Sequence, residues 1–384
     1  MSYLLQIPKK IIGGIGSLDN IKDLLKDINT KKATIITDNG VKNANLIEKP
    51  LDLLKSIGIS IEIVENVPSE PEIGQAEDIF SSIKNKTPDI LIGIGGGSVM
   101  DVTKLISVMM TNKESLEEII STGIIKNKGI TTMMIPTTAG TGSEVTKNSI
   151  VTNPEQQVKI TLSHELLIPD YVIADPLMTV KLPPAITAST GMDALTHAIE
   201  CYISKKANPF SDTFALRAVR LIARSIKKAY DNGKDIAARL DMSIGALYGG
   251  VCINSSGTAA VHALAYPLGG KYKVPHGVAN AMLLPYVIEF NSDVIEDKLA
   301  DIYNEMGLPN QEKLNNREKS CDVIKNIYLL VKELNIPNSI RNYGITENDV
   351  EEMARAASQI TRLMSNNPKK MSVNNIIDIY RKLL

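Results

Sequence analysis

The stretch Asp89-Ile-Leu-Ile-Gly-Ile-Gly-Gly-Gly-Ser98 decides the fold of the first half of the chain. Its apolar start predicts a buried strand, its glycines a tight turn, and the periodicity of residues 99–110 a helix. A strand that turns through glycines into a helix presents free backbone N–H groups and the positive end of a helix dipole, and both attract a phosphate. Ser98 stands where the Rossmann fingerprint has its last glycine, so the loop indicates nucleotide binding without matching that fingerprint. A turn packed for its own sake is the alternative.

Strands and helices alternate on both sides of this stretch. We expect strands at 32–38, 59–65, 89–94, 130–135 and 171–174, and helices at 44–57, 72–86 and 99–110, with Pro50 marking a break in the first helix. Such alternation predicts a parallel sheet with right-handed crossovers. After Pro183-Pro184 helical spacing takes over, in 187–202, 211–230, 236–251, 278–290, 293–306, 317–334 and 346–362. The fold class is therefore α/β plus all-α, with a Rossmann-like dinucleotide-binding domain over 1–182 and a helical metal-binding domain over 183–384.

Composition narrows the function. A formal net charge of −1 and 4% aromatic residues without tryptophan argue against a nucleic-acid partner. We expect no membrane partner, because no apolar run reaches the roughly 18 residues that span a bilayer. Three widely spaced cysteines form no disulfide framework, and the N-terminal residues lack the layout of a signal peptide. These features predict a cytoplasmic protein.

Three of the four histidines fall between Gly191 and Gly277. Asp193 and His197 are four residues apart in a helical run, so their side chains project from one face. His262 and His276 follow on either side of Pro-Leu-Gly-Gly, which we expect to be a turn. One carboxylate and three imidazoles suit Fe(II) or Zn(II). The alternatives are an exposed polar helix face and a core histidine, but a buried His near a buried Asp must be compensated, and a shared cation would compensate both.

Two further features favour a dinucleotide. Pro136-Thr-Thr-Ala-Gly-Thr-Gly-Ser-Glu144 is dense in hydroxyl side chains that suit ribose or pyrophosphate, although an ordinary polar loop is the alternative. Asp38 ends a predicted strand, where an acidic residue accepts from a ribose 2′-hydroxyl and repels a 2′-phosphate. NAD(H) is therefore favoured over NADP(H), unless Asp38 is only a cap.

Together these motifs closely resemble the iron-containing (group III) alcohol dehydrogenase family over essentially the whole chain. The resemblance rests on Gly95-Gly-Gly-Ser-x-x-Asp101-x-x-Lys104, on residues 136–145, on Gly191-Met-Asp-Ala-Leu-Thr-His-Ala-Ile-Glu200, and on His262 to Gly277. It implies one divalent metal, iron or in some members zinc, bound by Asp193, His197, His262 and His276. It implies cofactor contacts from a set of small, polar and basic residues: Gly95, Gly96, Gly97, Ser98, Asp101, Thr137, Thr138, Thr141 and Lys159. It also implies a homodimer.

Two positions depart from the family pattern. Tyr266 stands where many members have a histidine proposed to relay a proton, and a phenol is a poor relay at neutral pH. The helical spacing still places Tyr266 near the metal face, so we keep it among the catalytic candidates. Glu70 stands where many relatives have Asn near the adenosine, which puts that contact in doubt.

The predicted activity is a metal-dependent, NAD(H)-linked alcohol dehydrogenase or aldehyde reductase. Hydride would pass between the nicotinamide and a small primary alcohol, a diol or the matching aldehyde, whose oxygen binds the cation. The alternatives are a glycerol dehydrogenase-like or dehydroquinate synthase-like enzyme of the same fold, a metal-dependent hydrolase, and a non-catalytic binding protein. The sequence does not name the substrate.

Overall fold

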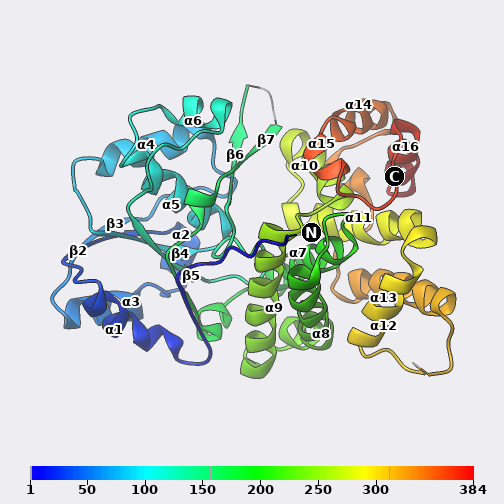
Figure 1. Cartoon of the computed structure of the whole chain (residues 1–384), viewed down its shortest axis with the longest axis horizontal. Helices are drawn as coiled ribbons and strands as arrows, with labels where there is room; N and C mark the ends of the chain where they lie inside the picture. The colour runs from blue at the N-terminus through cyan, green and yellow to red at the C-terminus, as the bar shows by residue number, and fades with distance from the viewer. Residues whose placement is uncertain (1, 156–157, 311) are drawn as a thin grey trace. The chain divides into compact units, whose positions relative to one another are not determined.

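The computed structural model describes residues 2–155, 158–310 and 312–384, which divide into two compact units. Residues 6–138 and 142–182 form the α/β unit, and residues 2–5, 139–141 and 183–384 form the helical unit. Figure 1 shows that the α/β unit is built around a sheet, whereas the helical unit consists of helices. The domain boundary expected between residues 182 and 183 stays a prediction.

A parallel sheet of six strands forms the centre of the α/β unit, in the order β1-β8-β5-β4-β2-β3. Its strands are β1 (Lys10–Gly13), β2 (Lys32–Ile36), β3 (Ser60–Val64), β4 (Ile90–Gly95), β5 (Thr131–Pro136) and β8 (Tyr171–Ala174). All five neighbouring pairs run parallel. The predicted parallel α/β fold is therefore confirmed.

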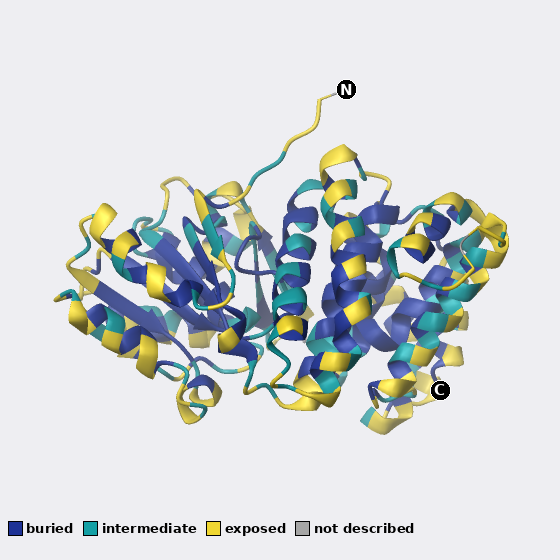
Figure 2. Ribbon diagram, turned by 90° about the horizontal axis from the view of Figure 1, so that it is seen from below, coloured by how far each residue is buried: buried dark blue, intermediate teal, exposed yellow. Residues whose placement is uncertain are grey.

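Alternate side chains of the strands serve the two faces of the sheet. Ile35 and Ile92 join the apolar cluster of α1 (Ile21–Asp27) and α3 (Glu48–Ser56). Ile36 and Leu91 join the cluster of α4 (Ile73–Ile83) and α5 (Gly97–Met109) on the other face. The inner strands β2, β4, β5 and β8 are mostly buried, and the helices expose their outer sides (Figure 2), as expected of a parallel sheet covered on both faces. The edge strands β1 and β3 are only partly buried.

The sequence left several elements of this unit unpredicted. The edge strand β1 and the helices α1, α2 (Asn39–Asn43) and α6 (Leu116–Thr122) are short. β6 (Asn148–Asn153) and β7 (Val158–Ser163) form a separate antiparallel hairpin. Pro50 does not break a helix, because α3 begins at Glu48 and the proline falls in its first turn, where no intrahelical N–H bond is lost.

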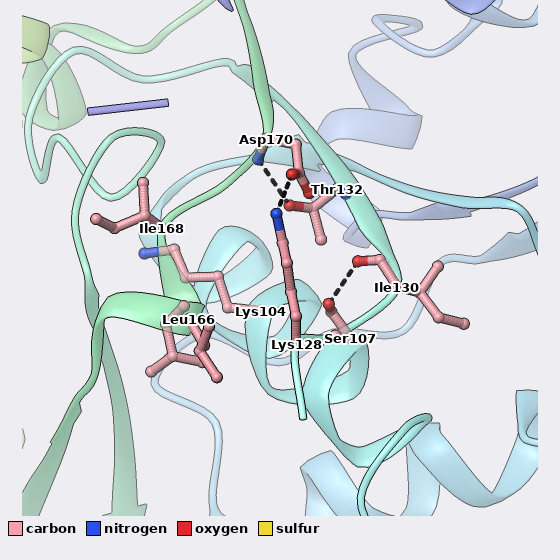
Figure 3. Close-up of a pocket in the computed structure, with 10 residues that line it drawn as sticks. Lys104, Ser107, Lys128, Ile130, Thr132, Leu166, Ile168 and Asp170 are labelled. Atoms are coloured by element: carbon pink, nitrogen blue, oxygen red, sulfur yellow. Dashed lines mark hydrogen bonds and ion pairs between the residues drawn. The ribbon is translucent and has the colours of Figure 1, made fainter. Parts of the chain in front are cut away.

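Hydrogen bonds and ion pairs of Asp170 connect the amino ends of β5 and β8 (Figure 3). The buried Asp170 accepts from the backbone N–H of Thr132 at 3.1 Å and pairs with Lys9 and Lys128. In return, the Asp170 N–H donates to Thr132 Oγ1 at 3.2 Å. The adjoining hollow has no room for a water-sized group, and ligands of such sheets bind at the carboxyl ends of the strands. This end of the sheet therefore serves stability.

The helical unit is formed by α7 (Pro184–Ile203), α8 (Pro209–Asp231), α9 (Ile236–Ser255), α10 (Ala260–Tyr272), α11 (His276–Asn291), α12 (Glu296–Glu305), α13 (Asn316–Glu333), α14 (Glu347–Ser358), α15 (Thr361–Met364) and α16 (Val373–Lys382). One continuous apolar core, which α7 crosses, joins them. In the described part of the chain, α9 alone is long and apolar enough to cross a membrane, and most of it is buried in this core. The predicted helical character of this half is confirmed.

The turn expected at Pro267-Leu-Gly-Gly270 is wrong, because these residues lie inside α10. The helix continues to Tyr272 and ends at Lys273, which has a left-handed φ of 56°. The chain then reverses through Val274 and Pro275, and His276 begins α11. The reversal thus lies after the predicted turn, immediately before the last histidine.

Candidate active site

A single stripe of α7 carries the acidic centre of the site. Asp193, His197 and Glu200 recur at intervals of four and three residues, so their side chains share a face of the helix. All three are buried. Pro184 at the first helical position favours the start of α7, and the apolar residues between the three polar ones pack into the core of the helical unit.

Two other helices bring histidines to the same carboxylate. Asp193 Oδ1 lies 3.8 Å from His262 Nε2 and 3.7 Å from His276 Nε2. The ligand atoms of these three residues all lie within 4.8 Å of one another. α11 approaches α7 closely at Gly277, where a Cβ would come within 2.2 Å of the Ser189 carbonyl oxygen. This glycine allows His276, its neighbour, to reach Asp193.

His197 faces the same oxygen from its own helix. Its Nε2 lies 3.7 Å from Asp193 Oδ1, and its ring stacks on that of His262 with centroids 4.7 Å apart. Its Nδ1 is buried without a hydrogen-bond partner. His197 is not within the tighter group of three ligand atoms. The three predicted histidine ligands nevertheless converge on one oxygen of the fourth predicted ligand, Asp193.

Burial and charge act in opposite directions on these groups. Burial alone would raise the pKa of Asp193, but the three histidines and an amide of Asn280 bring that pKa below its usual range. Burial lowers the pKa of His197, which favours its neutral form. The arrangement is therefore an ionised carboxylate among imidazoles.

The residues present fit a divalent cation of the iron or zinc type. Two ligand atoms bound about 2.1 Å from one metal lie roughly 3.0–3.4 Å apart, and the carboxylate–imidazole separations of 3.7–3.8 Å need only a small contraction. Nitrogen and oxygen donors together suit Fe(II) and Zn(II) better than Ca²⁺ or Mg²⁺.

Two supporting residues were not predicted from the sequence. Glu200 accepts from Val261 N–H and contacts His262 Nδ1, each at 2.6 Å. Asn280 Nδ2 lies 2.7 Å from Asp193 Oδ1 and 3.2 Å from the Nε2 atoms of His262 and His276. Their spacing in the sequence could have indicated them, because Glu200 lies on the same face of α7 as Asp193 and His197, and Asn280 lies one helical turn after His276.

The glycine loop of the α/β unit has the geometry expected of a phosphate cradle. Gly95 ends β4, Gly96 caps α5, and Gly97 and Ser98 open that helix with their N–H groups free of intrahelical partners. A Cβ on Gly95 would lie 2.5 Å from a methyl group of Val99, so no larger residue fits. The side chain of Thr138 lies against Gly96, and Thr137 N–H donates to the Gly95 carbonyl.

The remaining predicted cofactor residues lie in varied surroundings. Asp101 is buried, and its carboxylate accepts from Ser143 Oγ and Ile150 N–H and pairs with Lys104. This network joins α5 to the β6–β7 hairpin. Thr141 belongs to the short segment of residues 139–141 in the helical unit. The cofactor roles of these two residues stay predictions.

Asp38, Glu70 and Lys159 add charge near the carboxyl ends of the strands. Asp38 Oδ1 accepts from Val41 N–H at 2.9 Å, so this residue does cap a helix, α2. Lys159 Nζ pairs with Glu70 at 2.8 Å, and Glu70 N–H donates to Ser98 Oγ at 3.1 Å. Glu70 and Lys159 are therefore linked to the glycine loop.

Tyr266 lies one turn after His262 on α10, as the spacing predicted. Its ring centroid is 6.4 Å from that of His276. The Tyr266 ring thus borders the histidine cluster.

Fold and site together define a class: metal-dependent dehydrogenases that combine a nucleotide-binding α/β unit with a helical metal-binding unit. Comparison with known proteins then gives the family. Residues 8–176 match the profile of the iron-containing alcohol dehydrogenases, and residues 187–384 match the C-terminal profile of the same family. The chain belongs to the iron-containing alcohol dehydrogenase family.

Individual relatives match end to end. The chain is 36% identical to long-chain-alcohol dehydrogenase 1 of Geobacillus thermodenitrificans, over 96% of this chain and 93% of the relative. It is 32% identical to an NAD-dependent methanol dehydrogenase of Bacillus methanolicus, over 98% and 99%. The solved structure of a 1,3-propanediol oxidoreductase superposes with a TM-score of 0.95 at 34% identity, with both chains fully covered. The predicted family, fold and enzyme class are confirmed, and they favour a dehydrogenase over a hydrolase or a non-catalytic binding protein.

Proposed function

We propose that the chain reduces small aldehydes, and oxidises the matching primary alcohols or diols, with NAD(H) and one Fe(II) held by Asp193, His197, His262 and His276. The observation that carries this proposal is the convergence of the three imidazoles on Asp193 Oδ1 at 3.7–3.8 Å. Zn(II) fits the same donors. The relatives' names cover alcohols of very different length, so substrate size is set by residues outside this cluster.

Each group of site residues has a role that follows from its chemistry. When bound, the cation supplies Lewis acidity toward the substrate oxygen, and the nicotinamide carries the hydride. Asp193 offers the anionic ligand, and the neutral histidines offer nitrogen lone pairs. Tyr266 borders the site 6.4 Å from His276 and orients the substrate, while water exchanges the proton. The backbone of Gly95 to Ser98 holds the pyrophosphate.

The preference for NAD(H) rests on Asp38. Its carboxylate stands after β2, and capping occupies one oxygen while the negative charge that repels a 2′-phosphate remains. The Glu70–Lys159 pair places a further carboxylate beside the glycine loop. Asp38→Gly is expected to lower KM for NADPH relative to KM for NADH, because it removes the carboxylate that repels the 2′-phosphate. A wild-type enzyme that prefers NADPH would contradict the assignment.

We further propose a cytoplasmic homodimer that binds neither nucleic acid nor membrane. The cysteines Cys201, Cys252 and Cys321 are free, and the formal net charge is −1. Light scattering of the purified protein tests the dimer.

The main experiment follows NADH absorbance with propanal, 3-hydroxypropanal and a long-chain aldehyde, using metal-free, Fe(II)-loaded and Zn(II)-loaded protein. Turnover is expected only after metal loading. His276→Ala should lose bound metal and activity together, because it removes one ligand of the cluster. His164→Ala is the matched control, since this histidine lies in the α/β unit and accepts from Leu166 N–H. Full activity without metal refutes the proposed chemistry.

A further inference from the structure

Glu200 is buried at the metal cluster and uses both of its carboxylate oxygens. Oε1 accepts from Val261 N–H at 2.6 Å, and Oε2 lies 2.6 Å from His262 Nδ1. Its side chain is fully buried. Burying a carboxylate costs folding free energy unless its oxygens are hydrogen-bonded, and here each oxygen has one partner.

We propose that Glu200 is a positioning residue that fixes the tautomer of His262 and thereby points a bare Nε2 at the metal. A carboxylate only accepts hydrogen bonds, so the 2.6 Å contact requires a proton on Nδ1. In a neutral imidazole the other nitrogen, Nε2, then carries the lone pair. The proposal rests on the proposed metal site, because Nε2 is the atom that lies 3.8 Å from Asp193 Oδ1.

Asn280 gives independent support for the same tautomer. Its Nδ2 lies 3.2 Å from His262 Nε2, and an amide nitrogen donates but does not accept. The reverse orientation of the amide would set its oxygen 2.7 Å from the Asp193 carboxylate, where two acceptors repel. The two amide hydrogens of Asn280 face three atoms, Asp193 Oδ1 and the Nε2 atoms of His262 and His276, so a proton on His262 Nε2 would point at a donor group.

The two contacts of Glu200 also hold His262 in place. α10 begins at Ala260 without a side-chain cap of its own, and Val261 N–H is one of the donors that the first turn leaves unpaired. The Glu200 carboxylate, from α7, satisfies that donor and orients the imidazole of the next residue. A helix cap alone would explain the first contact but not the second.

Glu200→Gln separates the two roles. The glutamine oxygen can still accept from Val261 N–H, while its NH₂ group faces His262 Nδ1 and forces that nitrogen to become the acceptor. The proton then moves to Nε2, the atom that must bind the metal. Loss of such an outer partner typically weakens metal binding by about 10- to 100-fold, and we expect a loss of that size for Zn(II) measured by competition with a chromophoric chelator.

The direct readout is ring ¹⁵N NMR of histidine-labelled, metal-free protein, whose four histidines give few signals. We expect His262 to be protonated at Nδ1 in the wild type and at Nε2 in Glu200→Gln. Asp241→Asn is the control, because it makes the same acid-to-amide change on α9, where the carboxylate pairs with Arg224. It should leave the His262 signals and the Zn(II) affinity unchanged.

Wild-type His262 protonated at Nε2, or wild-type Zn(II) affinity in a folded Glu200→Gln protein, would overturn the proposal. If Glu200→Gln does not fold, the wild-type spectrum still decides, because it needs no variant. If the wild type binds no metal, the proposed metal site fails, whereas the tautomer measured without metal still tests Glu200.

Discussion

The carboxyl group of Glu144 predicts a specific pH dependence of stability. Glu144 is the last residue of the threonine-rich loop and is buried, with 3% of its surface exposed. Burial raises its pKa from 4.5 to about 7, against the opposing effects of its own backbone N–H and of Lys104. The folded chain therefore keeps a proton on this group at pH values where the unfolded chain has released it.

The sign and size follow from linkage. Between pH 4.5 and about 7 the folded state binds more protons than the unfolded state, so stability falls as pH rises and then levels off. One pKa unit corresponds to about 1.4 kcal/mol. Between pH 5 and pH 8 this group alone should therefore cost about 2–3 kcal/mol of the free energy of unfolding.

Glu144→Gln removes this titration and keeps the shape of the side chain. Urea unfolding followed by circular dichroism at pH 5 and pH 8 gives the free energies of unfolding for both proteins. The wild type should lose about 2–3 kcal/mol relative to the variant between these pH values. Glu117→Gln, an exposed change on α6, should run parallel to the wild type. Parallel curves for Glu144→Gln and wild type would refute the reasoning.

Three further outcomes follow from close contacts. Gly277→Ala places a methyl group against the Ser189 carbonyl oxygen, so we expect a loss of about 1–3 kcal/mol and weaker Zn(II) binding, measured by urea unfolding and chelator competition. Gly95→Ala sets a methyl group against Val99, and calorimetry should show weaker NADH binding with Zn(II) affinity unchanged. Burial would raise the pKa of Asp170, but Lys128, Lys9 and Thr132 N–H bring it below its ordinary value, so its stabilisation is present at neutral pH and fades in acid. Asp170→Asn should lose about 1–3 kcal/mol at pH 7 and converge with the wild type as the pH is lowered.

The fold was predictable where burial imposes a strong pattern. The apolar runs of β4 and β8 and the amphipathic repeats of α8 and α13 appear in the sequence because both faces of a parallel strand, or one face of a helix, must be apolar. The short edge strand β1 lacks such a pattern, since its side chains are only partly buried. Pro267 shows the converse error, because a proline inside α10 is tolerated where local signals indicate a turn.

The grouping of Asp193 with three histidines was predictable because few residue types can form a metal site. Only four histidines occur in 384 residues, so three of them within one stretch of the sequence are conspicuous. The four-residue interval between Asp193 and His197 predicts that both side chains lie on one face of a helix. Glu200 and Asn280 were not predicted, because acids and amides are common and their roles depend on which atoms approach them. Such roles require distances, which spacing along one helix does not give.

The supporting contacts explain how so many polar groups persist in an apolar core. Asp193 receives the Asn280 amide and faces three imidazoles, while Glu200 receives Val261 N–H and His262. Hydrogen bonds from neutral groups thus offset the burial of two carboxylates that a single helix, α7, carries seven residues apart. Because Glu200 faces His262 Nδ1 as a hydrogen-bond acceptor and the Asn280 amide faces His262 Nε2 as a donor, both contacts favour the same tautomer. A change at either residue should therefore alter the imidazole that both share, and the two changes should not be additive in metal affinity.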